Sequence, residues 1–340
     1  MRRREVLRSS ALFALGTLST AILGSCGNQS TTQGIGGGSL QSKSPLRVAL
    51  IPWVGWGSAH VAEVKDFFKA EGIEVKQTVF QTVSEVNTAL LSKQVDLAWL
   101  VALDLLVLSA QTPDLKFIYA SDYSGEVDAI VSHGISSPAD LKGKKIARED
   151  IPYEIAFTGK YIDSIGLTEK DVEILSLPVP DATSAFVTGK VDAATIYEPF
   201  IGKALKERPG SKILYTAKGS NIIANGLAGS QALLQDRRED VSAYLRAVDK
   251  AVKFQKDNVL EAYQILAKWT GTTDKEISGQ LTRIKLHNIE SNKSVVFNAS
   301  DKLYVAKGID AAAPVLKRTG KIAKALPGKD LVDDSFIKAL

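Results

Sequence analysis

Three acidic side chains gather in the segment "KKIAREDIPYEIAF", residues 144–157, where a strand is expected to give way to a helix. Glu149, Asp150 and Glu154 surround Pro152 in this segment. Acidic residues suit a helix start, because the free backbone N–H groups and the helix dipole favour negative charge, and proline suits the first helical position. The alternative is that these carboxylates face a site and neutralise a cation there. The spacing alone leaves both interpretations open.

More carboxylates and aromatic rings stand at the predicted ends of other strands. Carboxylates that converge in a low dielectric repel one another, so a cation is the ligand that would neutralise them. A planar guanidinium group pairs with carboxylates and stacks on tryptophan or tyrosine rings. The sequence therefore predicts an acidic, aromatic-lined cleft for a small nitrogenous cation such as guanidine. Its candidate ligand-binding residues are Trp53, Trp56, Asp104, Asp122, Glu154, Asp181, Tyr197 and Glu198.

Several of these residues also have a purely structural interpretation. Asp181 could simply cap the helix that follows "LPVP", and Asp122 could brace a hinge. One of Trp53 and Trp56 could be ordinary packing, and Trp99 could belong to the core. The sequence does not choose between these roles and contacts with a ligand.

Catalytic and metal-binding motifs are missing from the sequence. Its three histidines, His60, His133 and His287, are scattered and form no H-E-x-x-H motif and no Ser/His/Asp arrangement, and there is no glycine-rich phosphate loop. Cys26 is the single cysteine, which excludes an internal disulfide and a cysteine zinc site. Paired carboxylates could carry out hydrolytic acid/base chemistry, but the sequence does not give their separation. We predict a binding protein and not an enzyme, with no cofactor and no metal.

Composition and charge narrow the class further. The chain has 340 residues and 45% hydrophobic content, enough for a sizeable core and about two domains. Its formal net charge of +4 owes much to residues 1–25; the remainder has 38 basic and 37 acidic side chains, a net charge of +1. A nucleic-acid partner would need a concentrated basic face, so we expect none.

The amino terminus reads as a targeting segment. A basic "MRRREVLR" precedes the apolar run "ALFALGTLSTAILG", whose 14 residues are too few for a good membrane span. "RREVLR" resembles a twin-arginine export signal, and "LGSC" resembles the lipobox of bacterial lipoproteins. We expect residues 1–25 to be a signal peptide, Cys26 to be lipidated and so to anchor the exported protein at a membrane, and residues 26–45 to be a flexible tether of about 25 Å.

From Leu46 onward, β-type runs alternate with helical stretches, which is typical of α/β folds. A first run predicts strands at 46–51, 73–80, 95–100 and 115–120, with helices at 58–72, 83–94 and 102–111. A second run predicts helices at 137–143, 152–165, 181–190 and 198–208 and strands at 144–147, 172–177, 191–197 and 211–216. Residues 230–340 are predicted to be helical, with no further strand.

Seven segments, taken in order, resemble one known family: "LRVALIPWVGWG", "FFKAEGIEVK", "KQVDLAW", "ASDYSGEVDAIV", "SPADLKGKKIA", "VDAATIYEPF" and "YLRAVDKAVKF". They are similar to the nitrate, sulfonate and taurine branch of ABC-importer substrate-binding proteins, the NMT1/THI5-like family. The resemblance implies a type II periplasmic-binding-protein fold, in which two crossing strands join two α/β lobes and the ligand lies in the cleft between them. It places residues 46–124 and 226–340 in one lobe and 125–225 in the other. It also implies a monomer that hands a small molecule to the permease and ATPase of an importer.

One departure from that family's pattern bears on the ligand. Members that bind oxyanions carry a Gly-Ser or Gly-Thr pair after "DLKGKKIA", whereas this chain has Ile151 and Pro152 there and Glu154 close behind. Proline has no N–H to donate, and a carboxylate repels anions. A cation is therefore the main prediction. A small oxyanion (nitrate, a sulfonate or taurine) is the alternative, a thiamin-pyrimidine-related binding protein or enzyme is the second alternative, and a sensor in place of a carrier stays open.

Overall fold

Two mixed β-sheets organise residues 44–340, the part of the chain that the computed structural model describes. The first is six-stranded, with the order β11-β4-β10-β3-β1-β2. In it β1 runs parallel to β2 and β3, whereas β10 runs antiparallel to β3 and β4. We call the part built on this sheet the first lobe. Its strands are β1 (Leu46–Leu50), β2 (Val75–Val79), β3 (Leu97–Val101), β4 (Leu115–Tyr123), β10 (Ala224–Ser230) and β11 (Lys285–Leu286).

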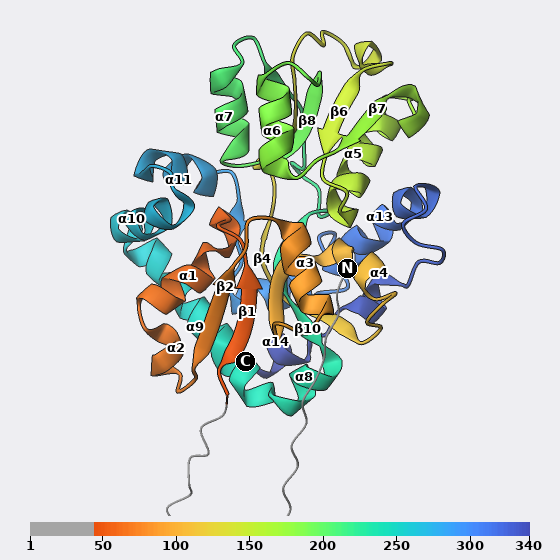
Figure 1. The fold of residues 1–340 in the computed structure, drawn as a ribbon. Helices are drawn as coiled ribbons and strands as arrows, with labels where there is room; N and C mark the ends of the chain where they lie inside the picture. The colour runs from red at the N-terminus through yellow and green to blue at the C-terminus, as the bar shows by residue number, and fades with distance from the viewer. Residues whose placement is uncertain (1–43) are drawn as a thin grey trace, which may run out of the picture. The chain divides into compact units, whose positions relative to one another are not determined.

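The second sheet is five-stranded, with the order β7-β6-β8-β5-β9, and we call the part built on it the second lobe. Here β6 runs parallel to β7 and β8, and β5 runs antiparallel to β8 and β9. The chain enters this lobe after β4 and leaves it before β10, so two segments cross between the sheets (Figure 1). Its strands are β5 (Asp128–Ser132), β6 (Lys145–Arg148), β7 (Glu173–Ser176), β8 (Ala193–Tyr197) and β9 (Lys212–Thr216).

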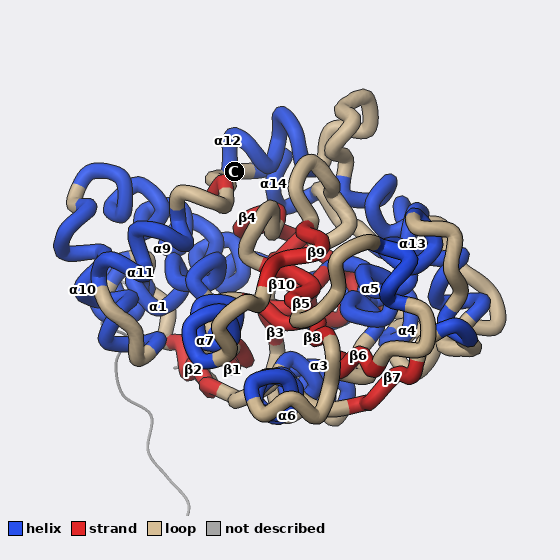
Figure 2. Tube along the Cα trace, turned by 90° about the horizontal axis from the view of Figure 1, so that it is seen from above, coloured by secondary structure: helices blue, strands red, loops and turns tan. Residues whose placement is uncertain are grey.

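Helices cover both faces of the first sheet. The connection from β1 to β2 and the connection from β2 to β3 run in opposite directions along the sheet, which places α1 and α3 on opposite faces. Figure 2 shows α1, α9, α10 and α11 on one side of the strands and α4 and α13 on the other. The helices are α1 (Gly57–Val64), α2 (Phe67–Ala70), α3 (Val83–Leu91), α4 (Leu105–Leu108), α5 (Pro152–Ser164), α6 (Val179–Val187), α7 (Phe200–Glu207), α8 (Gln231–Asp236), α9 (Arg238–Asp257), α10 (Val259–Thr270), α11 (Asp274–Leu281), α12 (Ile289–Ser291), α13 (Val305–Arg318) and α14 (Ser335–Ala339).

The start of α3 shows how local sequence fixes an element near the boundary between the lobes. The Thr82 hydroxyl accepts the N–H of Glu85 at 3.2 Å, and the Glu85 carboxylate accepts the N–H of Thr82 at 3.0 Å. This capping box satisfies two backbone donors that a helix start would otherwise leave free. It fixes the position of Val83, the first residue of the helix.

Most predicted elements are confirmed, and four differ. The helix expected at 137–143 is only a 3-10 turn at Pro138–Leu141. The helix expected at 58–72 is divided into α1 and α2, because Asp66 adopts a left-handed backbone with φ of 56°. The helix expected at 102–111 is shorter: a 3-10 turn at Ala102–Asp104 precedes the four residues of α4. The prediction of no strand after residue 230 is wrong, because β11 pairs with the carboxyl end of β4. A two-residue strand has no hydrophobic period that a sequence could reveal.

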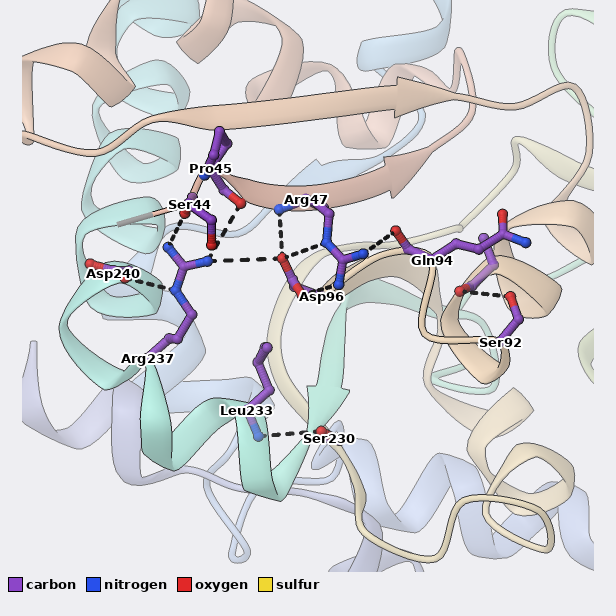
Figure 3. Close-up of polar contacts among 11 residues, drawn as sticks. Ser44, Pro45, Arg47, Ser92, Gln94, Asp96, Ser230, Leu233, Arg237 and Asp240 are labelled. Carbon is purple, nitrogen blue, oxygen red and sulfur yellow. Dashed lines mark hydrogen bonds and ion pairs between the residues drawn. The ribbon is translucent and has the colours of Figure 1, made fainter. Parts of the chain in front are cut away.

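An ionic cluster fastens the first described residues to the first lobe (Figure 3). Asp96 accepts hydrogen bonds from the Arg47 guanidinium at 2.6 and 3.1 Å and from the Arg47 backbone N–H at 2.9 Å. Arg237 lies 3.9 Å from the same carboxylate and donates to the carbonyl of Ser44 at 2.8 Å. The start of β1 is thereby tied to the loop before β3 and to the start of α9.

The predicted signal peptide, the lipidation at Cys26 and all but the last two residues of the predicted tether lie outside the described residues. Within residues 44–340, no helix combines the length and the apolar character that a membrane span requires. The lobe boundaries predicted at residues 124 and 226 remain a prediction.

Candidate ligand-binding site between the lobes

A small cavity of about 20 Å³ lies where the two lobes meet. Its walls come from residues next to the carboxyl ends of β1, β3 and β8, from the starts of α3, α5 and β5, and from β10. Carboxyl ends of parallel strands are where ligands of open α/β sheets bind, so the position is that of a ligand site. The lining residues are Ile51, Trp53, Trp56, Val83, Val101, Asp128, Tyr153, Tyr197 and Asn225.

Aromatic rings from both lobes form much of the wall. Trp53 of the first lobe meets Tyr197 of the second edge to face, with ring centroids 5.8 Å apart and an interplanar angle of 80°. Trp56 packs against Trp99 at 6.4 Å. The buried indole Nε1 of Trp56 has no hydrogen-bond partner among residues 44–340, whereas that of Trp53 faces the Asp122 carboxylate and helps to lower its pKa. Trp53, Trp56 and Tyr197 thus lie where the sequence placed them, while Trp99 stands behind the wall and is fully buried.

Asp128 is the acidic residue in the wall, and sequence reasoning did not select it. It is the first residue of β5, it is 5% exposed, and the Ser124 hydroxyl donates to its Oδ2. Burial raises the pKa of Asp128 to about 7, although the hydrogen bond from Ser124 lowers it. The charges of Asp122 and Glu198 add to the rise. The available signal was its position directly after the first crossing segment, inside the quoted "ASDYSGEVDAIV".

Asp122 lies directly behind the wall. Its carboxylate accepts from Asn225 Nδ2 and from Ser121 Oγ, both at 2.9 Å, and burial raises its pKa to about 6 against these bonds. Gly55 permits the close approach of Trp53 and Asp122, because a Cβ at Gly55 would lie 2.2 Å from Asp122 Oδ2 and 2.5 Å from Trp53 Nε1. Asp122 therefore orients Asn225, one of the lining residues.

Asp104 reaches from the first lobe to the second. It is fully buried, and its Oδ1 accepts the backbone N–H of Tyr153 at 2.8 Å. Its Oδ2 accepts from Asn87 Nδ2 of α3 at 3.2 Å. Burial raises the pKa of Asp104 to about 7 against both bonds, and the charge of Glu149 contributes to the rise.

Glu154 is fully buried in the first turn of α5 but is not part of the cavity wall. It accepts the backbone N–H of Glu149 at 2.6 Å, and Tyr153 Oη lies 3.3 Å from its Oε1. Burial, with the charges of Glu149 and Asp128, raises the pKa of Glu154 well above its usual range. The Glu149 N–H and the Arg148 guanidinium lower that pKa, but by less. Its carboxyl group thus binds the loop before α5 and accepts no helical N–H among the described residues; its predicted contact with a ligand remains a prediction.

The two remaining candidate acids stand further from the cavity. Glu198 accepts from Arg283 at 2.6 Å and from the N–H of Gly202 at 3.1 Å, so the protein itself supplies its counter-charge. Asp181 is exposed in the first turn of α6. Neither belongs to the residues that line the cavity.

The wall offers one carboxylate, one amide, two phenols and two indoles, with aliphatic side chains between them. Within the part of the chain that the structure describes, the residues lining the cavity include no lysine, arginine or histidine. Residues 44–340 also contain no group of three or more histidine, cysteine or acidic side chains placed to hold a metal ion. The arrangement can hold a small ligand by stacking, by hydrogen bonds and by one negative charge.

A family model described as "NMT1/THI5 like" matches residues 56–262. The chain belongs to the NMT1/THI5-like family. The matched region carries all but two of the cavity-lining residues, Ile51 and Trp53 lying before it.

Two curated relatives of this NMT1/THI5-like protein are named for a sulfonate or taurine, and others are named only as putative binding proteins. A Bacillus subtilis protein named "Putative aliphatic sulfonates-binding protein" is 29% identical over 319 residues, covering 93% of this chain and 90% of the relative. The taurine-binding periplasmic protein of Escherichia coli is 29% identical over 154 residues, covering 44% of this chain and 47% of the relative.

Solved structures establish the type II periplasmic-binding-protein fold. The periplasmic aliphatic sulphonate binding protein SsuA from Escherichia coli matches with a TM-score of 0.71 at 18% identity, over 86% of this chain and 93% of that one. SsuA from Xanthomonas axonopodis pv. citri, bound to MOPS, matches with a TM-score of 0.72 at 18% identity, over 86% and 99% of the two chains. The predicted fold class is confirmed.

The prediction of a binding protein in place of an enzyme agrees with the names of these relatives. The fold alone would not decide the matter, because the desulfurization enzyme DSZB shares it, with a TM-score of 0.62 at 12% identity over 87% of this chain and 98% of that one.

Proposed function

We propose that this NMT1/THI5-like protein is the extracytoplasmic solute-binding component of an ABC importer. The family, the fold and the named roles of the relatives support this. A ligand enclosed between the lobes would be delivered to a permease driven by an ATPase, and export with lipidation at Cys26 would keep the protein at the membrane. Cys26→Ser should leave the membrane fraction, because the described residues hold no membrane span. Retention of that variant would contradict the lipid anchor.

The ligand we propose is a small nitrogenous cation such as guanidinium. The observation that carries this is the charge of the wall: Asp128 faces the cavity, and among the described lining residues no basic side chain opposes it. A guanidinium there would pair with Asp128 and stack on the Trp53 and Tyr197 rings. Its positive charge would offset the unfavourable free energy of a carboxylate buried without a counter-ion. An anion would meet Asp128 and, behind it, the Asp122 carboxyl group.

The size of the cavity supports a ligand of few atoms. Its volume of about 20 Å³ leaves room for one or two water-sized groups, far below the range of roughly 300–1,000 Å³ usual for drug-sized ligands. Guanidinium has four heavy atoms, and at the ceiling of about −1.5 kcal/mol per heavy atom it would bind with a Kd of tens of micromolar.

A small sulfonate such as taurine is the second candidate, and the names of the relatives favour it. Taurine also carries an ammonium group, which Asp128 could hold. Its sulfonate, however, would need donors, and the side-chain donors of the wall without a partner among the described residues are the Trp56 indole N–H and the Tyr197 hydroxyl. Two neutral donors are a weak substitute for a cation or an open helix start.

A thermal-shift series on the purified protein separates the two candidates. At a hundredfold excess over Kd, a ligand of the folded state stabilises by about 2.7 kcal/mol. We expect guanidinium chloride at a few millimolar to raise the Tm relative to sodium chloride at equal ionic strength, and sulfate, nitrate and taurine to leave it unchanged. A shift with taurine and none with guanidinium would replace the first proposal with the second.

A further inference from the structure

The start of α5 is a helix terminus whose own sequence cannot cap it. The N-cap residue, Ile151, has extended backbone and an aliphatic side chain, and it makes no side-chain cap with any described residue. Pro152 at the first helical position has no N–H. Tyr153 therefore provides the first N–H of the helix, at the end that carries the positive pole of the helix dipole.

Asp104 supplies the missing cap from the other lobe. It ends the 3-10 turn after β3, on the first lobe, and accepts the Tyr153 N–H at 2.8 Å. The amide of Asn87, also on the first lobe, holds its other oxygen at 3.2 Å. The ring of Tyr153 lines the cavity, so the contact fixes part of the cavity wall. Because donor and acceptor belong to different lobes, separating the lobes breaks this cap.

A second buried carboxylate near this boundary, that of Glu149, belongs to the second lobe. Glu149, on the second lobe, is 5% exposed, and its Oε2 has no hydrogen-bond partner among the described residues. The backbone N–H groups of Ser84, at the start of α3 on the first lobe, and of Val179, at the start of α6 on its own lobe, oppose the rise that burial causes in its pKa. Asp104 is therefore the acid whose hydrogen bond joins the two lobes at a helix start.

We propose that Asp104 determines ligand specificity: its carboxylate occupies the anion-attracting start of α5, which excludes oxyanions and holds the two lobes together around a cation. This inference rests on the proposed function and extends it to a residue outside the cavity wall. The positive end of a helix binds sulfate, phosphate or carboxylate readily. An oxyanion entering here would have to displace Asp104 or lie beside it, and two anions in a buried site repel each other strongly.

The test compares the wild-type protein with Asp104→Asn, which loses the charge and keeps the size, and Asp104→Ala, which also exposes the helix start. Guanidinium and sulfate are titrated by calorimetry, and amide hydrogen exchange is followed at Tyr153 in the absence of either. We expect guanidinium to bind about three- to tenfold more weakly to both variants, because Asp104 acts on the wall through Tyr153 and makes no contact with the ligand. Sulfate should bind at least tenfold more tightly than to the wild type, and exchange at Tyr153 should accelerate, more in Asp104→Ala than in Asp104→Asn.

Asp163→Asn is the matched control. Asp163 also lies on α5, and Arg318 of α13 donates to both of its oxygens at 2.8 Å. Both side chains of this pair are at least 40% exposed, so removing the charge should change neither ligand affinity by more than twofold. If Asp104→Asn fails to fold, Asn87→Ala, which removes the amide that holds Asp104, should change the same three quantities in the same direction.

The outcomes separate this inference from the proposed function. Sulfate titration and hydrogen exchange need no cation, so a wild-type protein that ignores guanidinium overturns the proposed ligand without deciding the role of Asp104. That role is overturned if the Asp104 variants bind sulfate no better than the wild type, or if exchange at Tyr153 keeps its wild-type rate.

Discussion

Two clusters of carboxylates in this protein have opposite environments. Asp96, at the amino end of β3, is bound by Arg47 and lies near Arg237 (Figure 3). Burial opposes the ionisation of Asp96, but the hydrogen bonds and charge of Arg47, aided by Arg237, outweigh it and lower its pKa. Near the carboxyl end of the same strand, Asp104 and Asp128 are buried without a basic partner among the described residues, and their pKa values rise to about 7.

The difference separates acids that stabilise the fold through an ion pair from acids that have no basic partner among the described residues and could bind a ligand. The protein supplies both charges of the Asp96 cluster, so that cluster is complete once the chain has folded. At the cavity it supplies carboxylates alone, and these are costly to bury in ionised form. A cation from outside would complete that second cluster. The predictions below test this contrast, from the largest expected effect to the smallest.

The largest effect is expected from Asp128→Asn. It removes the one charge in the described cavity wall and should weaken guanidinium binding by about 10- to 150-fold in calorimetric titration. At pH 8 the Tm of the ligand-free variant should rise, because the neutral amide needs no proton to be buried. A variant that binds guanidinium as well as the wild type would show that Asp128 is not the counter-charge.

Asp96→Asn should have the reverse effect. Losing the paired hydrogen bonds with Arg47 should lower the free energy of unfolding by about 1–2 kcal/mol, the lower part of the range for charged groups because Arg47 is half exposed. Guanidinium affinity should stay within twofold of the wild type. Denaturant unfolding and calorimetry measure the two quantities, and a fall in affinity without a fall in stability would contradict the contrast.

The two clusters should also respond oppositely to pH. The pKa values of Asp104, Asp122 and Asp128 are raised to about 7, 6 and 7, so between pH 4 and 7 the folded protein binds more protons than the unfolded chain. Their contribution to stability is full below about pH 4 and is lost as the pH rises through 6 to 7. The lowered pKa of Asp96 acts the other way: its contribution is present above about pH 4 and is lost at lower pH.

Ligand binding gives that pH dependence a measurable sign. A cation requires ionised Asp128, so the Tm shift produced by guanidinium should be larger at pH 8 than at pH 5.5. Thermal melts of wild type and Asp128→Asn at both pH values measure it, and the variant should show no such difference. A shift that shrinks as the pH rises would exclude a cation held by this carboxylate.

The smallest effect is expected from Glu154→Gln. Burial raises the pKa of Glu154 well above its usual range and so disfavours the ionised form, and glutamine resembles the neutral side chain in charge and size. The amide oxygen can still accept the Glu149 N–H. We expect changes below threefold in affinity and below about 0.5 kcal/mol in stability. A tenfold loss of guanidinium affinity would show that Glu154 contributes to the ligand site.

The sequence by itself determined the alternation of strands and helices, because buried strands and amphipathic helices differ in hydrophobic period. It also placed Trp53, Trp56 and Tyr197 near one edge of a sheet, where the carboxyl ends of parallel strands meet, and all three line the cavity; their contact with a ligand stays a prediction. For the same reason the segments that form the cavity were foreseeable in outline.

Only the tertiary structure decided which acids face the cavity. Asp128 and Glu154 are both buried acids of the second lobe, yet one lines the cavity and the other accepts a backbone N–H behind the wall. Asp104 has its partner 49 residues further along the chain, in the other lobe. Whether a carboxylate is paired, neutral or free to bind a ligand depends on neighbours from distant segments and on the loss of water around it. The local sequence around the residue determines neither.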